Sequence, residues 1–400
     1  MRKDWVEVEL IDACTIHDNM RKPINSQERA SRIAGKDISQ LFPYYGATGQ
    51  VGYIDDFLTD GKYVLIGEDG APFLDFTKDV AYMINGKCWV NNHAHILLSK
   101  FNNKFLLYYL NQVNLKDYVS GTTRLKLTQS SLKQIPVKVA PLPEQRAIVS
   151  KIELLFSELD NAVSNLKQAK DKLEIFRQSV LKKAFEGELT KESKKLEKKK
   201  LGDVIKIKSG DGLSKSNRND TGKFLVYGGN GVTGRHSEYM FEEQRLIIGR
   251  VGVHCGNAYI TKPNSWVTDN AFVVDFDKEK IYIMFLLYLI GNLNLNQYSN
   301  STAQPVISGG TVYPVEFYLP NSIQDQQEIV KEIETRFSVA DKLAESIDES
   351  LFKAEALRQS ILKKAFEGEL LSEAELVACR KEADWEPAEK LLERIKRERK

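Results

Sequence analysis

Two long stretches of the chain carry apolar residues at steps that alternate between four and three. This spacing keeps the apolar side chains on one narrow stripe of a helix, as in the seam of a coiled coil. The alternative is a pair of amphipathic helices packed on separate globular domains, but such helices usually show a wider apolar stripe. We therefore expect two helices that pack on each other. The residues expected to pair them are Ile148, Ile152, Leu155, Leu159, Leu166, Leu173, Ile329, Ile333, Leu343, Ile347, Leu357 and Ile361.

Residues that suit helix ends stand at the borders of these stretches. Pro143 precedes the first stretch, and proline is well accepted in a first helical turn. Gly187 and Gly368 follow the two stretches, and glycine readily adopts the left-handed conformation that ends many helices. We expect the first helix to begin near Pro143 and both helices to end near these glycines.

The segments before each helix have a different pattern. WVEVEL near the N-terminus alternates apolar and polar residues, while KYVLIG (62–67) and RLIIG (245–249) are short apolar runs. Glycine-rich clusters separate them, which is typical of strands joined by turns. FLLYYL (105–110) and IMFLLYLI (283–290) are typical of buried helices. The mixture predicts two α+β heads.

The chain is an internal repeat. RQSVLKKAFEGEL (177–189) recurs as RQSILKKAFEGEL (358–370), and only Val180 and Ile361 differ. The heads match more loosely, as in YYGATGQVG beginning at Tyr44 and VYGGNGVTG beginning at Val226. A repeat that varies in one part and holds in the other indicates different ligands presented on a common frame.

The fold class that we expect is α+β, with two pseudo-symmetric heads separated by an antiparallel pair of long coiled-coil helices. Antiparallel helices would let one chain close on itself through a pseudo-twofold axis. The expected divisions are a first head at 1–142, a central helix at 143–190, a charged linker at 191–200, a second head at 201–320, a C-terminal helix at 321–370 and a helical tail at 371–400.

Composition narrows the class of protein only a little. The chain has 400 residues, more than one hydrophobic core usually serves, and 42% of them are hydrophobic. The 57 basic and 55 acidic residues give a formal net charge of +2. A nucleic-acid surface would therefore have to be a local concentration of basic groups.

Cysteine usage and the lack of long apolar runs indicate a soluble cytoplasmic protein. The four cysteines are scattered without a CxxC pair, and they fit neither a disulfide framework nor a zinc site. The N-terminal residues lack the apolar core of a signal peptide. The longest apolar run, 281–290, is about half of the roughly 20 residues that span a bilayer.

Glycine-rich turns and polar loops at matching points of the two heads contain the candidate ligand-binding residues. A glycine-rich turn lets the backbone approach a phosphate or a base edge closely. In the polar loops 122–128 and 302–308, arginine suits guanine and glutamine suits adenine, although an ordinary solvated loop is the alternative. The candidate DNA-binding residues are Tyr45, Thr48, Arg124 and Lys126 in the first head and Asn230, Arg250 and Gln304 in the second.

Two other kinds of site receive less support. The glycines at 229, 231 and 234 match GxGxxG, but no clear helix follows them, and a dinucleotide site needs that helix. His93 and His95 could form a metal pair, yet the second head has Asn270 and Phe272 near that place. We therefore expect neither a dinucleotide site nor a metal site.

Motifs for catalysis are also missing. The chain contains no NPPY-like or DPPY-like motif for amino-methyl transfer, no GxxxxGK[ST] loop for ATP and no PD…ExK-type nuclease cluster. A catalytic DNA methyltransferase is thus disfavoured, and we expect a protein without catalytic residues of its own.

The expected helix pair can be compared with DNA in length. The 32-residue step from Ile148 to Val180 rises about 48 Å at about 1.5 Å per residue. This equals roughly 14 base pairs. The helix pair is therefore expected to match two half-sites slightly more than one turn of DNA apart.

Several of these segments together resemble the specificity subunit of type I restriction-modification systems. They are PLPEQRAIVSKIE (141–153), its partner QDQQEIVKEIE (324–334), the two RQS blocks, and the head segments YYGATG and YVSGTTRLKLTQSSLKQIPV. The order head, helix, head, helix spans nearly the whole chain. The resemblance implies two target-recognition domains, each reading half of an asymmetric bipartite site in double-stranded DNA.

The resemblance also implies partners. It implies two methyltransferase subunits and, in the restricting form, two motor-nuclease (restriction) subunits. No cofactor would be bound by this chain, and S-adenosylmethionine, ATP and Mg²⁺ would belong to the partner subunits. The alternative is a stand-alone structural or regulatory protein that binds bipartite DNA without methyltransferase partners.

Overall fold

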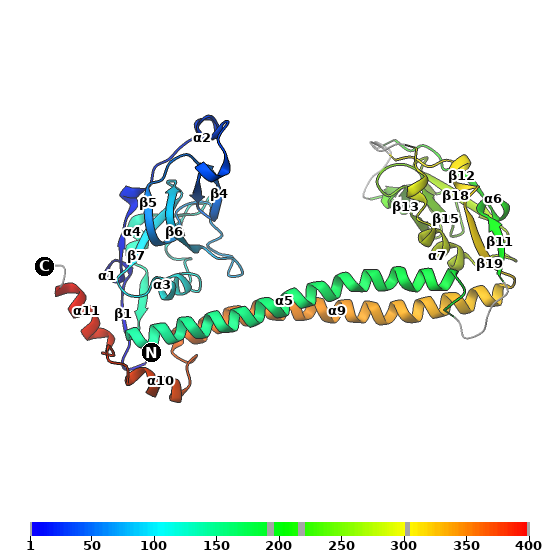
Figure 1. Ribbon diagram of the computed structural model, residues 1–400. Coiled ribbons are helices and arrows are strands. Elements are labelled where there is room, and N and C mark those ends of the chain that lie inside the picture. The colour runs from blue at the N-terminus through cyan, green and yellow to red at the C-terminus, as the bar shows by residue number, and fades with distance from the viewer. Residues whose placement is uncertain (1, 190–195, 215–220, 301–304, 398–400) are drawn as a thin grey trace. The chain divides into compact units, whose positions relative to one another are not determined.

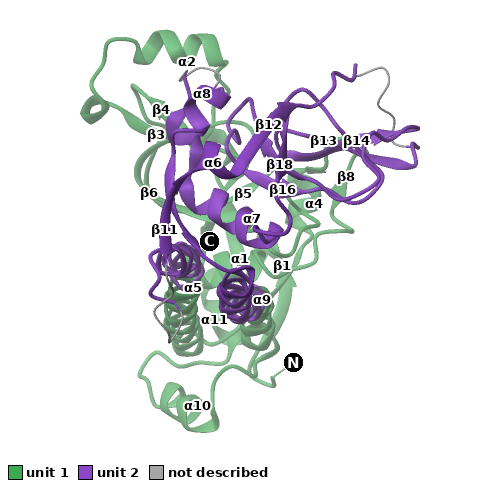
Figure 2. Cartoon of the chain, turned by 90° about the vertical axis from the view of Figure 1, so that its right-hand side faces the viewer, with its two compact units in different colours: residues 1–166, 349–400 green, residues 167–348 purple. Residues whose placement is uncertain are grey.

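The computed structural model describes residues 2–189, 196–214, 221–300 and 305–397. Its helices and strands are labelled in Figure 1. The chain divides into two compact units, unit 1 of residues 1–166 with 349–400 and unit 2 of residues 167–348 (Figure 2). Each unit contains an α+β head and parts of both long helices. We call the residues before the first long helix head 1 and residues 196–320 head 2.

Head 1 is built around a six-stranded sheet with the order β2-β7-β5-β6-β3-β4. Strand β3 runs parallel to β6, and the other neighbours are antiparallel. Separate pairs are formed by β1 with β10 and by β8 with β9. The strands are β1 (Val6–Glu9), β2 (Cys14–Ile16), β3 (Phe42–Gly46), β4 (Gly49–Ile54), β5 (Thr59–Gly67), β6 (Ala81–Val90), β7 (Ala94–Ser99), β8 (Val119–Ser120), β9 (Lys126–Leu127) and β10 (Pro136–Val139). The helices are α1 (Leu10–Ala13), α2 (Ser26–Ile33), α3 (Asn103–Leu110) and α4 (Gln129–Lys133).

Head 2 repeats this sheet in two pieces. Its strands follow the orders β12-β18-β15-β16 and β14-β13-β17, with β11 paired to β19. The strands are β11 (Leu196–Lys200), β12 (Ile205–Ser209), β13 (Phe224–Gly228), β14 (Gly231–His236), β15 (Leu246–Gly249), β16 (Ala258–Ile260), β17 (Ser265–Val267), β18 (Ala271–Phe276) and β19 (Glu316–Pro320). The helices are α6 (Leu201–Val204), α7 (Ile283–Leu293) and α8 (Gly309–Val312).

The break in head 2 lies where head 1 has the continuous strand β6. Strands β16 and β17 pair with β15 and β13, just as β6 pairs with β5 and β3. Between them stand Pro263, which has no N–H for a ladder, and Asn264, whose φ of 52° lies in the left-handed region. One strand of head 1 therefore becomes two in head 2 without a change of strand order.

The apolar run of β5 is buried because both faces of the sheet are covered. Val64 and Ile66 belong to the core that contains α3 and the long helices, whereas Leu65 belongs to a smaller cluster on the other face. Head 2 has the same division, with Ile248 on the helix side and Ile247 on the other. A continuous apolar run is what a strand covered on both faces requires.

The long helices α5 (Leu142–Phe185) and α9 (Ile323–Glu367) run antiparallel within each unit. In unit 1, Arg358 of α9 forms an ion pair with Asp160 of α5. In unit 2, Arg177 of α5 forms an ion pair with Asp341 of α9, at 2.5 Å. The expected fold class, with α+β heads and an antiparallel pair of long helices, is confirmed.

The same three-residue contact joins helices and head in both units. In unit 1 the guanidinium carbon of Arg358 lies 4.3 Å from the ring centroid of Phe156, and that ring meets Tyr108 of α3 edge-on at 5.8 Å. The equivalent contact in unit 2 is formed by Arg177, Phe337 and Tyr288, with distances of 5.1 and 5.8 Å. We call these the Arg–Phe–Tyr contacts.

The seam between the helices differs from the expected one at two positions. Leu343 and Leu357 are 50% and 51% exposed, so they do not pair the helices. The positions beside them, Ala344 and Arg358, are partly buried instead. Hydrophobicity favours Leu357 over Arg358 as a seam residue, but Arg358 packs its long side chain across the partner helix. The remaining residues of the expected seam are buried or partly buried: Ile148, Ile152, Leu155, Leu159, Leu166, Leu173, Ile329, Ile333, Ile347 and Ile361.

Both long helices end as their glycines predict. Gly187 and Gly368 each have a φ of 81°, a conformation that is costly for residues with a side chain. The residue after each glycine donates its N–H back to the helix, from Glu188 to Lys183 O and from Glu369 to Lys364 O. This is the hydrogen-bond pattern that closes a helix C-terminus.

One segment differs from the expected divisions. Residues 196–200, expected in a charged linker, form β11, since their backbone pairs with β19 along its whole length. The tail folds as α10 (Glu373–Arg380) and α11 (Ala388–Arg397), and both belong to unit 1. Ion pairs of Arg146 with Glu382 and Asp384 hold the tail on α5. In the described residues, no helix is sufficiently long and apolar to cross a membrane.

Candidate nucleic-acid interface

Four backbone segments meet at one end of the sheet in head 1. Strand β5 ends there, β3 turns into β4, β6 turns into β7, and the segment before α4 crosses them. Backbone hydrogen bonds tie these segments together, from Asn91 N to Tyr45 O at 3.1 Å, Glu68 N to His93 O at 2.7 Å, Leu127 N to Glu68 O at 2.7 Å and Gly70 N to Leu125 O at 3.2 Å. We call residues 45–48, 67–70, 91–93 and 124–127 the four-segment frame of head 1.

Head 2 has the same frame, residue for residue. Its four hydrogen bonds run from Thr268 N to Tyr227 O at 2.8 Å, Arg250 N to Asn270 O at 2.9 Å, Ile307 N to Arg250 O at 3.1 Å and Gly252 N to Pro305 O at 2.9 Å. An isolated bridge between Val251 and Val306 matches the one between Asp69 and Lys126. The four-segment frame of head 2 therefore consists of residues 227–230, 249–252, 268–270 and 305–307.

Close backbone packing explains the glycine that ends the central strand of each frame. A Cβ on Gly67 would lie 2.9 Å from Ala47 O, and a Cβ on Gly249 would lie 2.3 Å from Gly229 O. Backbone atoms cannot yield as a side chain can, so a larger residue would force the segments apart. The glycine-rich runs thus build the frame. In head 2 they form the β13–β14 hairpin, and no helix follows as a dinucleotide site would need.

The frame of head 1 carries paired charges. Asp69 accepts a hydrogen bond from Nη2 of Arg124 at 3.1 Å and lies 2.6 Å from Nδ1 of His93. Glu68 pairs with Arg21 and, at 3.1 Å, with Nζ of Lys126. Arg124 and Lys126 are 59% and 50% exposed, so they face solvent while each is held by a carboxylate.

The acidic members of this network are strongly held. Burial alone would raise the pKa of Glu68, but hydrogen bonds from Arg21 and Lys126 keep that pKa below its ordinary value. Burial would likewise raise the pKa of Asp18, yet its hydrogen bonds with His95 and Gln129 keep it low. Glu68 and Asp18 therefore stay ionised and hold the side chains that hydrogen-bond to them.

The frame of head 2 carries mostly neutral side chains. The twins of Asp69, His93 and Lys126 are Val251, Asn270 and Val306. The twin of Glu68 is Arg250, so the charge at this point of the frame is reversed. The Arg250 guanidinium carbon lies 5.5 Å from the ring centroid of Phe272, and Nη1 lies 3.5 Å from Asp269 O and from Ser209 Oγ.

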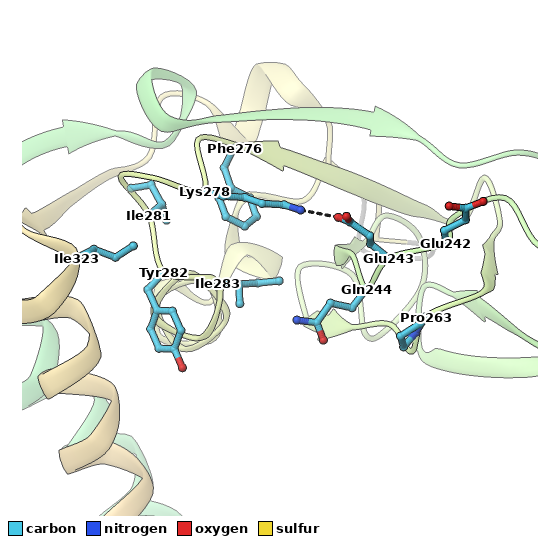
Figure 3. Close-up of a pocket in the computed structure, with 10 residues that line it drawn as sticks. All are labelled: Glu242, Glu243, Gln244, Pro263, Phe276, Lys278, Ile281, Tyr282, Ile283 and Ile323. Carbon is cyan, nitrogen blue, oxygen red and sulfur yellow. Dashed lines mark hydrogen bonds and ion pairs between the residues drawn. The ribbon is translucent and has the colours of Figure 1, made fainter.

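A cavity of about 490 Å³ in unit 2 is not part of this frame (Figure 3). It opens before the first residue of β15 and beyond the last residue of β18, whereas the frame lies at the opposite ends of these strands. Its charged rim includes Lys278 and Glu243, whose side chains pair at 2.6 Å. The lining residues are Glu242, Glu243, Gln244, Pro263, Phe276, Lys278, Ile281, Tyr282, Ile283 and Ile323.

The two heads and their helices match a known protein family, the type I restriction modification DNA specificity domain. Residues 2–174 and 193–351 match this family, one stretch for each head. The chain belongs to it. The resemblance inferred from the helix blocks and the head segments is thus confirmed.

Individual members of the family are similar over part or most of the chain. A type I restriction enzyme specificity subunit of Haemophilus influenzae is 34% identical over 154 residues, which are 38% of this chain and 37% of that protein. The StySPI specificity subunit of Salmonella potsdam is 27% identical over 342 residues, 77% of this chain and 72% of that protein. The chain thus spans little more than a third of the first relative and nearly three quarters of the second.

A solved structure shares the fold of these specificity domains. It comes from work on complex assembly and conformational transition of the type I R-M system. The TM-score is 0.70 at 17% sequence identity, with 92% of this chain and 99% of that chain covered.

The frames of the specificity domains contain most of the predicted DNA-binding residues. Tyr45 is half-buried and stacked on Tyr82 at 5.8 Å, and Thr48 is exposed in the β3–β4 turn. Asn230 is exposed in the β13–β14 turn, where its Oδ1 accepts from Tyr259 Oη at 3.3 Å. Gln304 lies outside the described residues. The frames therefore gather Tyr45, Thr48, Arg124 and Lys126 in head 1 and Asn230 and Arg250 in head 2.

The acidic side chains in the frame of head 1 were not predicted from the sequence. Glu68 and Asp69 follow an apolar strand and look like an ordinary polar turn. The alignment of VLIGEDG (64–70) with LIIGRVG (246–252) contains the usable signal, because a charged pair there replaces arginine and valine. His93 and His95, considered as a metal pair, instead contact Asp69 and Asp18.

Proposed function

We propose that this chain is the sequence-specific DNA-recognition subunit of a type I restriction-modification complex. Each head reads one half of a bipartite, asymmetric target in double-stranded DNA. The chain itself has no catalytic role, and it directs methyltransferase and restriction subunits to the target. Family membership supports the recognition role, and the number and activities of the partner subunits are part of the proposal.

The observation that supports two different half-sites is the pair of matched frames. Four backbone hydrogen bonds have the same partners in both heads, so the segments present their side chains in equivalent positions. At those positions head 1 has Glu68, Asp69 and Lys126, while head 2 has an arginine and two valines. Base edges are distinguished by donors, acceptors and the thymine methyl group. Equal frames with unlike side chains are suited to reading unlike sequences.

Cofactors follow from this division of labour. S-adenosylmethionine, ATP and Mg²⁺ would bind to the partner subunits, and this chain would bind none of them. The predicted DNA-binding residues are proposed to contact DNA, with the exposed Arg124 and the half-buried Arg250 at base edges. They are Tyr45, Thr48, Arg124, Lys126, Asn230, Arg250 and Gln304.

Methylome sequencing of the host with and without the gene tests this function. A methylated bipartite motif should disappear when the gene is deleted and return when it is restored. Replacing residues 201–320 with the corresponding head of a relative should then change one half of the motif and leave the other. A stand-alone regulatory protein, the alternative, would bind bipartite DNA but leave the methylome unchanged.

A further inference from the structure

Arg124 combines high exposure with a fixed position, which is unusual for a surface arginine. Its side chain is 59% exposed, yet Nη2 donates to Asp69 Oδ1 at 3.1 Å. The guanidinium also lies against the backbone of Gly70, because a Cβ on that glycine would be 3.0 Å from Nε and 3.2 Å from Nη2 of Arg124. Gly70 has a φ of 69°, so a side chain there would be strained as well.

The main chain around Arg124 is held from both sides. Gly70 N donates to Leu125 O, and Leu127 N donates to Glu68 O, so the segment after Arg124 is tied to the segment that carries Asp69. On the other side, a Cβ on Gly121 would lie 2.5 Å from Arg124 O, which shows how closely the loop folds back on itself. Backbone and guanidinium are therefore both positioned before any ligand binds.

A pre-positioned arginine of this kind suits a base better than a phosphate. The carboxylate of Asp69, itself only 21% exposed, offsets the positive charge of Arg124 and so weakens its attraction to a phosphate. Hydrogen bonds from Arg124 to a neutral base edge are weakened less by the neighbouring negative charge than its attraction to a phosphate is. Guanine offers the two acceptors O6 and N7 that the forked donors of arginine fit. Fixing the side chain in advance also lowers the entropy lost on binding.

Head 2 lacks this arrangement among its described residues. The twin of Asp69 is Val251, and a Cβ on the glycine equivalent to Gly70, Gly252, would meet nothing within 4 Å. The arginine of that frame is Arg250, which stands at the position of Glu68 and rests against Phe272. The two heads thus supply an arginine from different points of the same frame.

We propose that Asp69 is a positioning residue that holds Arg124 for one guanine of the first half-site. The proposal rests on the function proposed above, since it names how one head reads its half of the target. Asp69 determines specificity without contacting DNA, and Gly70 leaves the space in which the guanidinium lies.

The test uses the full chain in complex with its methyltransferase partner and a set of duplexes. Each duplex carries one substitution in the motif that methylome sequencing defines. The variants are Arg124→Ala, Asp69→Ala, the double variant and Asp69→Asn, with Asp75→Ala as a control. Asp75 is an exposed carboxylate that bonds only within its own loop, to Thr77 and Lys78.

We expect Arg124→Ala and Asp69→Ala to lower discrimination at the same guanine about tenfold, and the double variant to add no further loss. Asp69→Asn, which keeps an acceptor for Nη2, should retain most of the discrimination. Asp75→Ala and the second half-site should be unaffected. Circular dichroism identifies any variant that fails to fold. If Asp69→Ala fails to fold, the comparison rests on Asp69→Asn, whose small loss should fall on the guanine that Arg124→Ala affects and on no other position; a loss at other positions would overturn the proposal.

Two further results would overturn the proposal alone. One is a loss of affinity in Asp69→Ala that is equal for every duplex. The other is a double variant in which the two losses add, because independent losses mean that Asp69 does not act through Arg124. A wild-type complex without any sequence preference would instead overturn the proposed function, and this inference with it.

Discussion

Removing the ring of Phe366 should detach head 1 from the helices. Phe366 of α9 is 1% exposed, and its ring meets those of Phe105 and Tyr109 in α3 edge-on, both at 5.1 Å. Replacing a core phenylalanine with alanine costs about 3–5 kcal/mol. A domain is stabilised by only about 5–15 kcal/mol in total. Phe366→Ala should therefore remove a large part of the stability of unit 1.

The equivalent residue of the other repeat allows the cost of losing the phenylalanine ring to be compared within one chain. Phe185 of α5 is 7% exposed and has one edge-on ring partner, Phe285 of α7, at 5.3 Å. An aromatic pair adds about 0.5–1.5 kcal/mol beyond its buried area. Phe185→Ala should therefore cost about 1 kcal/mol less than Phe366→Ala, and its effect should fall on unit 2. Phe352→Ala, at a ring that is 77% exposed, is the control and should stay within about 0.5 kcal/mol.

Hydrogen exchange resolved by peptide is the suitable assay, because it reports the two heads separately. Phe366→Ala should speed exchange in α3 and in the β1–β10 pair, and Phe185→Ala should do so in α7. A cost below about 1 kcal/mol for Phe366→Ala would refute the reasoning. So would faster exchange in α7 that equals the change in α3, since the ring contacts of Phe366 lie in unit 1.

Four further outcomes are expected. Arg250→Ala should weaken specific binding by about 1–3 kcal/mol and relax one position of the second half-site, measured on substituted duplexes; a uniform loss with a smaller salt slope would assign Arg250 to a phosphate. Because folding lowers the pKa of Glu68, this group contributes stability at pH values above its ordinary pKa of about 4.3, and that stability is lost as the pH falls through the pKa in the folded state. Glu68→Gln should therefore flatten the acid limb of the pH dependence of unit 1 unfolding, and an unchanged limb would contradict this. Residues 1–190 alone should dimerise, with Arg177 of each copy over Phe156 of the other, and light scattering that finds a monomer would exclude it. The purified full chain should show no methyltransferase, nuclease or ATPase turnover in standard assays, and robust turnover would remove the recognition-only role.

Much of the fold was predictable because its signals are local. Strands β1, β5 and β15 and helices α3 and α7 lie where short apolar runs indicate them. The helix ends follow from Pro143, Gly187 and Gly368, whose backbone preferences do not depend on distant contacts. The pairing of heads with helices followed from the repeat.

The parts that were missed depend on contacts distant in the sequence. The tail is held on α5 by Arg146 and Lys151, whose acidic partners lie more than 220 residues away. The pattern of polar and apolar residues along the sequence cannot identify such pairs, because each partner alone looks like a solvated surface residue. Asp69 was missed for the same reason, since its partner Arg124 is 55 residues away. The seam was misplaced at Leu357 because hydrophobicity ranks leucine above the neighbouring arginine.

The Arg–Phe–Tyr contacts explain why one part of each repeat is nearly identical while the other varies. Arg177 and Arg358 must each reach a phenylalanine and an aspartate on the other helix, and that phenylalanine must also meet a tyrosine of the head. A substitution at any of these positions would disturb the helix pair and the head together. The four-segment frame has the opposite property. Its hydrogen bonds join backbone atoms, so the side chains on it can change without loss of the frame. The side chains on the frame can therefore differ between the two copies, and with them the ligand, while the contacts between helices and head stay the same.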